Sequence, residues 1–375
     1  QTCALPILPG PSVPVSGVLA ATLTMRGSIE APSGRADITV AGASWEGAQV
    51  GDLVVQGIAD GRDVRAEASA AALGLTATGS AALQGARQAV VDIRGPALQL
   101  ARLTALLPAG SIPVDVSGQA DVSAHAEGPL TSWRAGRVTV RVGGLDGSLG
   151  TVPFSLTGPT DVQVSGQSIS VAPTTLRVGG VTLSAEGALG FSNVPSLNGL
   201  TVAARGDLGA FVGLAAGVGY PLPIAEARGG VDGAVSVSGS LQTPRLMGDV
   251  RVDAGHAVIS GSPPLDDLQA LVHIEPDAIT LPVFSARVDE AAVSASGWLP
   301  MAWTRGRAAL AGTTAASATV RVRHVTPGLL GRLATGQTPP DVSGSLDATL
   351  TVEASRPRLD AVTGELRIDR LDATL

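Results

Sequence analysis

The chain contains no lysine, and its 375 residues include only four tryptophans, four phenylalanines and one tyrosine. All 25 basic residues are therefore arginines, and the formal net charge is −7. Proteins that bind nucleic acid carry clustered positive charge, and those that bind single strands add aromatic side chains on which the bases stack. This composition predicts that nucleic acid is not a partner.

Cysteine is nearly absent as well, because Cys3 is the only one. It lies in Gln1–Ile7, which is what a common sequencing-adapter oligonucleotide encodes when it is read in frame. We therefore expect residues 1–7 to be an adapter-derived scar and leave them out of the fold prediction. The remaining chain has no thiol, so we predict no disulfide framework. No signal peptide is recognisable, and we expect the chain to be an internal fragment of a longer protein.

Glycine, proline and small apolar residues make up much of what the chain does have. It contains 48 glycines and 25 prolines, and 45% of its residues are hydrophobic. That hydrophobic content predicts a folded chain rather than a disordered one. Most of the apolar surface has to come from valine, leucine, alanine and isoleucine, and the β-branched residues among them favour strands.

Four segments share one pattern, in which apolar and polar residues alternate. They begin at Gly17, Gly118, Gly229 and Gly344, a long repeat of roughly 110 residues. Such alternation is typical of a strand with one buried and one solvated face. A second alternating segment in the same phase follows each one after a turn, which predicts a repeated hairpin. Beyond the scar at 1–7, the repeat divides the chain into β-repeat units at residues 8–97, 98–206, 207–323 and 324–375, the last of them truncated.

Short helical segments are expected where one unit meets the next. Apolar residues at three- and four-residue spacing occur in residues 100–107, 208–214 and 329–333, a pattern typical of brief amphipathic helices. Residues 208–225 carry no charge, but they contain four glycines and two prolines. Because a membrane-spanning helix needs about 20 apolar residues, we predict no span there.

Many short strands at regular spacing predict a mainly β fold, as a sandwich array, a barrel or a long open sheet. A sandwich normally has a large aromatic residue in each core, and an outer-membrane barrel has aromatic girdles. The scarcity of aromatic residues disfavours both. We predict a long curved open sheet that folds into a taco-like apolar groove.

Catalytic and metal-binding motifs give no support for an enzyme. The motif H-E-x-x-H, the phosphate-binding loop and the nucleophile elbow G-x-S-x-G are all missing from the sequence. His125 falls in the polar phase of its strand, where a solvated histidine is a simpler interpretation than a metal ligand. The acid pairs Asp266-Asp267 and Asp289-Glu290 are interpreted as turn residues, because strand neighbours point to opposite faces. We predict no catalytic residue, no metal and no cofactor.

Three segments carry a recurring pattern of valine, glycine and proline. Gly229–Val252 reads GGVDGAVSVSGSLQTPRLMGDVRV, Pro264–Ile274 follows P-L-x-D-L-x-A-x-V-x-I, and Ala295–Leu299 closes with A-x-G-x-L. In these segments the chain resembles the TamB and AsmA-like proteins of the Gram-negative envelope.

The resemblance implies a taco-shaped sheet whose apolar interior conducts phospholipid acyl chains across the periplasm, between the inner and the outer membrane, and so supports outer-membrane biogenesis. It also implies an inner-membrane anchor, which lies outside this chain. For TamB-like members it implies an outer-membrane barrel partner of the Omp85 class, reached through parts outside this chain.

The apolar face of the alternating strands is where we expect the function to lie. Small side chains leave room that tryptophan would fill, and removing acyl chains from water is favourable by about 0.8 kcal/mol per CH₂. The alternative is that a second layer covers this face, which would make the chain a closed-core structural β-repeat protein of a cell surface or the extracellular space. The residues predicted to line a lipid groove are Leu19, Leu23, Met25, Val122, Val138, Val140, Val142, Val231, Val235, Val237, Val250, Val252, Leu346, Leu350 and Val352.

Overall fold

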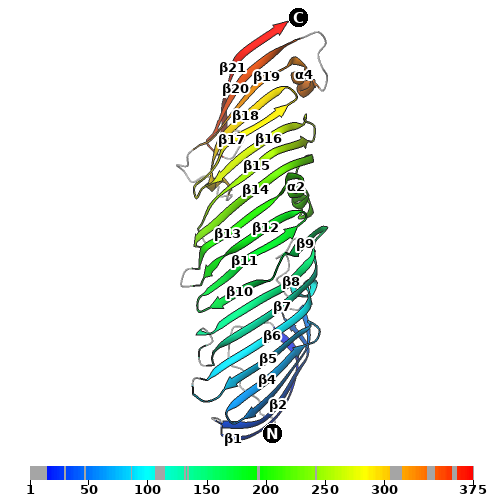
Figure 1. Cartoon of the computed structure of the whole chain (residues 1–375), viewed down its shortest axis with the longest axis vertical. Coiled ribbons are helices and arrows are strands. Elements are labelled where there is room, and N and C mark those ends of the chain that lie inside the picture. The colour runs from blue at the N-terminus through cyan, green and yellow to red at the C-terminus, as the bar shows by residue number, and fades with distance from the viewer. Residues whose placement is uncertain are drawn as a thin grey trace. The chain divides into compact units, whose positions relative to one another are not determined.

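The alternating segments do form strands, and the protein is mainly β (Figure 1). Hydrogen bonding assigns the 21 described strands to one sheet, and the strand pairings are antiparallel. The predicted long sheet is thereby confirmed. Contacts along the chain define an N-terminal part that ends at Thr174 and a C-terminal part that begins at Thr175. The computed structural model describes residues 15–28, 31–45, 48–85, 87–105, 115–130, 132, 135–191, 195–240, 243–304, 315–335, 343–356 and 361–374, so the expected scar at 1–7 lies outside them.

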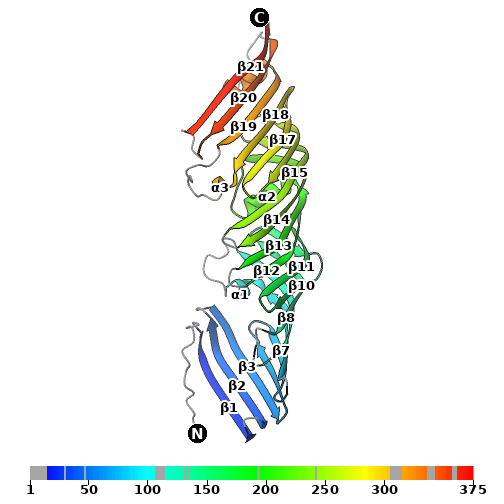
Figure 2. The same ribbon diagram turned by 90° about the vertical axis from the view of Figure 1, so that its left-hand side faces the viewer.

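The strands of the N-terminal part follow one another as a meander. Their bounds are Val15–Ser28 (β1), Ala31–Trp45 (β2), Ala48–Asp60 (β3), Asp63–Ala70 (β4), Leu75–Ala82 (β5), Gln88–Gln99 (β6), Val116–Pro129 (β7), Arg137–Leu149 (β8), Val152–Leu156 (β9) and Thr160–Ser165 (β10). From β1 to β8 each strand pairs with the next along the chain, and β8 then pairs with both β9 and β10. This part of the sheet is curved, because Figure 2 shows β1 to β3 face-on where β7 is nearly edge-on.

The C-terminal part continues the same connectivity. After β11 (Ser168–Val178), which contains the boundary between the parts, the strands are Val181–Gly190 (β12), Ser196–Asp207 (β13), Ile224–Ser240 (β14), Pro244–Ile259 (β15), Leu265–Ile274 (β16), Ala278–Val288 (β17), Ala291–Pro300 (β18), Ala316–Val325 (β19), Ser343–Ala354 (β20) and Val362–Thr374 (β21). Each strand from β12 to β21 pairs with the next. The four expected hairpins are therefore present as β1–β2, β7–β8, β14–β15 and β20–β21.

Short helices lie where the apolar spacing predicts them. Helix α1 (Leu100–Thr104) precedes β7, α2 (Leu208–Gly217) precedes β14 and α4 (Pro327–Thr335) precedes β20. Helix α3 (Met301–Thr304), after β18, was not expected. The end of the first predicted helical segment, residues 106–107, lies outside the described residues.

Asp207 fixes the start of α2. Its carboxylate accepts a hydrogen bond from the Gly209 N–H at 2.8 Å, as an N-cap does, and another from the Gly229 N–H in β14 at 2.9 Å. One side chain thus ties the helix to the strand that follows it.

The cross-strand register gives the sheet one apolar and one polar face. Residues that face each other across antiparallel strands share a face, and alternation along each strand keeps the faces separate. An apolar row of the N-terminal strands runs Leu23, Ala36, Gly57, Ala66, Gly79, Val91, Ala126, Val138, Val164 and Ile169. A neighbouring row on the other face runs Thr22, Asp37, Gln56, Glu67, Thr78, Asp92, His125, Thr139, Gln163 and Ser170. No apolar side chain interrupts that polar row.

The C-terminal part repeats this separation. Its apolar row from β13 to β21 runs Gly206, Val231, Val252, Ala270, Phe284, Ala295, Val320, Leu350 and Leu366. A polar row from β16 to β21 runs Gln269, Ser285, Ser294, Arg321, Thr349 and Arg367. Each part is therefore an amphipathic sheet.

A compact core forms where a helix packs against strand ends. In the C-terminal part Val288, Ala291 and Val325 are buried together with Leu329 of α4. Half-buried Val293, Val322 and Leu346 pack around them. Helix α4 thus covers the apolar residues at these strand ends.

Candidate functional site: the apolar face

All of the predicted groove residues lie on the apolar face of their part of the sheet. The registers pair Leu19 with Val40, Val122 with Val142 and Val235 with Val202. The prediction of their common face is therefore correct, whereas their role in holding lipid stays a prediction.

Most of these side chains are only partly shielded from solvent. Leu19 and Leu23 of β1 are each 67% exposed, whereas Val231 is buried at 8%. Met25 and Leu350 are also exposed. The others are half-buried: Val122, Val138, Val140, Val142, Val235, Val237, Val250, Val252, Leu346 and Val352.

Exposure persists because the described strands form one layer. Extensive contacts between strands occur between hydrogen-bonded neighbours, and each helix contacts strands that lie close to it in sequence. A closed β core would require a second sheet or a helix layer over this face. Monomeric soluble proteins rarely expose contiguous apolar patches beyond a few hundred Å², so an open face of this kind marks an interaction surface.

Several exposed members of the apolar face were missed by sequence reasoning. Leu366, Ile368 and Leu371 of β21 are exposed and pair in register with Leu350, Ala348 and Leu346 of β20. The alternation of Glu365 to Ile368 already carried the signal. Other exposed members are Val91, Ile93, Val202 and Val362.

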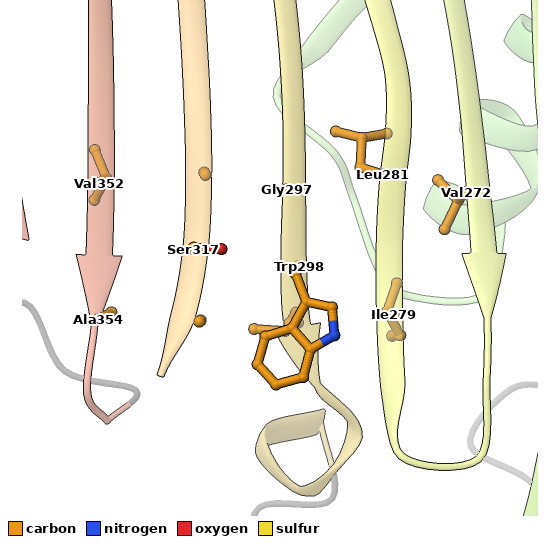
Figure 3. Close-up of a pocket in the computed structure, with 11 residues that line it drawn as sticks. Val272, Ile279, Leu281, Gly297, Trp298, Ser317, Val352 and Ala354 are labelled. Carbon is orange, nitrogen blue, oxygen red and sulfur yellow. The ribbon is translucent and has the colours of Figure 1, made fainter. Parts of the chain in front are cut away.

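The apolar face is hollowed in two places. In the N-terminal part a hollow of about 270 Å³ is lined by Ala89, Val91, Ala126, Leu130 and Val138, among others. In the C-terminal part a hollow of about 370 Å³ crosses β16 to β20. Figure 3 shows the latter, with labelled residues of the five neighbouring strands in view. The second hollow is lined by Val272, Ile279, Leu281, Gly297, Trp298, Leu299, Ala316, Ser317, Ala318, Val352 and Ala354.

The opposite face is held by charged pairs between and along strands. Arg205 Nε lies 2.5 Å from Asp232 Oδ2 across β13 and β14. Hydrogen bonding from Arg35 lowers the pKa of Asp37, and hydrogen bonds from Thr349 and Arg367 lower the pKa of Asp369. Exposed pairs of this kind contribute little stability each, but they keep the face strongly hydrated.

Three of the four histidines pair with an aspartate on a neighbouring strand. The distance from Nδ1 to the carboxylate is 2.8 Å for His125 and Asp92 and 2.7 Å for His256 and Asp266, and His273 pairs with Asp249. The His125 side chain is 50% exposed, which confirms the solvated histidine expected there. The hydrogen bond with Asp92 raises the pKa of His125, with further contributions from the charges of Asp92 and Glu127.

The acid pairs are placed differently from one another. Asp289 and Glu290 form the turn between β17 and β18, as predicted. Asp266 and Asp267, however, lie within β16, so their assignment to a turn was wrong. The register shifts between Asp266 and Gln269, and Asp267 has a φ of 52°, so a local irregularity sets the directions of the two carboxylates. Asp266 pairs with His256, and Asp267 with Arg287.

Neither metal chemistry nor a spanning helix is found in the segments of the chain that the structure describes. No group of three or more histidine, cysteine, aspartate or glutamate side chains is arranged to hold a metal ion in these residues. The same residues include no helix that is both long and apolar enough to cross a membrane. Of the uncharged stretch 208–225, α2 covers only Leu208–Gly217.

The fold and the apolar face define a mainly β protein built on an antiparallel meander with one hydrated and one solvent-accessible apolar face. No family model matches this chain, and neither a curated protein nor a solved structure matches it.

Proposed function

We propose that this chain is a non-enzymatic segment of a lipid conduit, whose apolar face shields phospholipid acyl chains from water. The observation that supports the proposal best is the continuous apolar row that crosses the strands of each part while one face remains open. Each CH₂ that such a surface removes from water contributes about 0.8 kcal/mol. A lipid with two long chains therefore gains strongly from a wall that has no specific polar contacts.

The size of the side chains also favours an acyl chain as the occupant. The apolar row of the N-terminal part contains alanine and glycine at Ala36, Gly57, Ala66, Gly79 and Ala126. These residues leave space above the sheet, and the polymethylene chain is flexible enough to fill an irregular space. A protein partner would instead need matched shape and an aromatic or arginine anchor to bind tightly.

The setting of the conduit belongs to the proposal and rests on the resemblance to the TamB and AsmA-like proteins. In that setting the segment belongs to the periplasm, within a protein anchored in the inner membrane, and lipid moves between the inner and outer membranes. An Omp85-class barrel is the proposed partner, reached through other regions of the full-length protein. The hydrated face with its arginine–aspartate pairs suits contact with water on the outside of such a conduit.

Photo-crosslinking in Gram-negative cells tests the proposal at one strand. Val235 lies on the apolar face opposite Gly248, whereas Ser236 lies on the polar face opposite Met247. A photo-reactive amino acid at position 235 should capture phospholipid, and the same residue at position 236 should not. Mass spectrometry of the adducts identifies the lipid.

Two outcomes would contradict the conduit. Capture of protein alone at both positions would favour the closed-core structural protein, because a second protein layer would then be covering the face. Equal lipid capture at both positions would indicate nonspecific contact with membranes.

A further inference from the structure

The hollow that crosses β16 to β20 has a mostly apolar lining. Among its lining residues none is charged, and Ser317 carries the one hydroxyl group. It lies in the C-terminal part, on the face that the proposed function uses, because Leu281, Gly297, Ala318 and Val352 are successive partners in the apolar register.

The hollow exists because small residues form its floor between taller walls. Gly297 has no side chain, and Ala316, Ala318 and Ala354 end at Cβ. A Cβ added at Gly297 would lie 3.6 Å from the Ala318 Cβ, so even one methyl group would begin to fill the floor. Leucine, isoleucine and valine side chains of β16 and β17 form one wall, and Val352 stands on the opposite side (Figure 3).

The dimensions fit one elongated apolar molecule. Five neighbouring strands are separated by four spacings of about 4.8 Å, which gives a length of about 19 Å across the strands. The volume of about 370 Å³ is near the lower end of the range of small-molecule sites, roughly 300–1,000 Å³. A long, flexible and uncharged chain matches this shape better than a compact or polar ligand.

We propose that this hollow is a discrete resting site for a single acyl chain. The inference rests on the proposed function and deepens it, because lipid then pauses at a defined position instead of contacting the apolar face evenly. The acyl chain can come from a phospholipid or from a free fatty acid, and both present the same methylene groups to Val272, Leu281 and Val352.

Trp298 reports occupancy from the edge of the hollow, because it lines the hollow beside Gly297 while its partners Thr280 and Ser317 place it in the polar register of β18. The substitutions Trp45→Phe, Trp133→Phe and Trp303→Phe leave it as the only tryptophan of the chain. Bromine atoms quench indole fluorescence only at close range. The first arm uses vesicles of phosphatidylcholine that carries bromine midway along one acyl chain, and the second arm uses brominated stearic acid. We expect Trp298 to lose part of its emission in a saturable titration, and the arm that produces the loss identifies the source of the chain.

Filling the hollow should abolish the loss of emission. Ala318 is exposed on the floor, so Ala318→Phe in the Trp298-only protein occupies the site without crowding a core. The matched control is Ala292→Phe, at an exposed alanine of β18 that faces Arg287 and Arg323 on the polar face. This control should keep the full loss of emission. Circular dichroism checks that each variant is folded. If Ala318→Phe does not fold, Ala354→Phe serves as a second variant that fills the hollow.

The proposal is overturned if neither brominated ligand quenches Trp298, or if the filling and control variants respond alike. Lipid capture at Val235 without quenching of Trp298 would overturn the resting site and leave the conduit intact. Lack of lipid capture at Val235 would instead contradict the conduit, whatever Trp298 does.

Discussion

Residues of the apolar face that a helix covers, here called the covered corners, differ sharply from the uncovered residues beside them, such as Val235 and Leu350, here called the open strip. On β20, Ala348 is buried near the α4 core, whereas Leu350, two residues further along the same face, is 38% exposed. Leu329 of α4 is only 3% exposed. Alternation alone thus produces an apolar face, and at this end of β20 the face becomes a core because α4 lies on it.

This difference separates stability from function within one face. Buried residues near the helices gain hydrophobic stabilisation and are costly to change. Residues of the open strip, such as Val235, gain less from folding because water still reaches them. The backbone ladder of the meander holds them in place, so their side chains are available to contact a ligand.

The largest effect should come from placing a charge in a covered corner. Val181 of β12 is fully buried. It lies beside Gly206, and α2 covers this place: a Cβ added at Gly206 would be 3.3 Å from the Val181 Cα and 3.4 Å from the Phe211 ring of α2. Val181→Arg buries an unpaired charge and should lower the free energy of unfolding by several kcal/mol. Val235→Arg on the open strip should lower it by about 1 kcal/mol or less, because the guanidinium can reach water. Urea denaturation followed by circular dichroism measures both.

Val235→Arg should nevertheless remove function. Lipid capture by a photo-reactive residue at Val237, on the same face of β14, should fall strongly in this variant because a charge then stands in the path of the acyl chains. Equal destabilisation by the two arginine substitutions would show that the strip is a closed core.

A milder truncation sharpens the same comparison within the C-terminal part. Leu329→Ala removes a side chain from the α4 core and should cost about 2–5 kcal/mol. Leu350→Ala removes the same atoms from the open strip and should cost about 1 kcal/mol or less. Hydrogen exchange at the amides of β19 and β20 reports local opening, and it should increase much more for the first substitution. A similar increase for both would mean that Leu350 is buried in solution.

Sequence alone could predict this face because period 2 is local. Once Val122, Ala124 and Ala126 alternate with polar residues, antiparallel pairing must place them with the apolar residues of the next strand. Where alternation fails, prediction fails too. Asp266 and Asp267 lie at a register shift, and the four-residue α3 is too short to show a helical period.

The depth of the apolar face could not be predicted from the sequence. The hollow at Trp298 depends on the relative heights of side chains from five strands, from Val272 to Ala354. Which apolar residues a helix covers depends on where α2 and α4 pack after each strand ends. Both are properties of packing between elements, and no single stretch of sequence contains them.

The smallest effect should come from the polar face, where His125 and Asp92 form an exposed pair. The pKa of His125 is raised above its ordinary value of 6.5, chiefly by the hydrogen bond with Asp92. A raised pKa in the folded state means that the pair stabilises fully below about pH 6.5, and that this contribution is lost as the pH rises through the folded-state value. Asp92→Asn should therefore lower the His125 pKa in an NMR titration and leave the other histidine signals in place. It should also lower the free energy of unfolding slightly at pH 5, with little difference from the original protein at pH 9. A decrease in that free energy that is as large at pH 9 as at pH 5 would show that Asp92 acts through packing rather than through its charge.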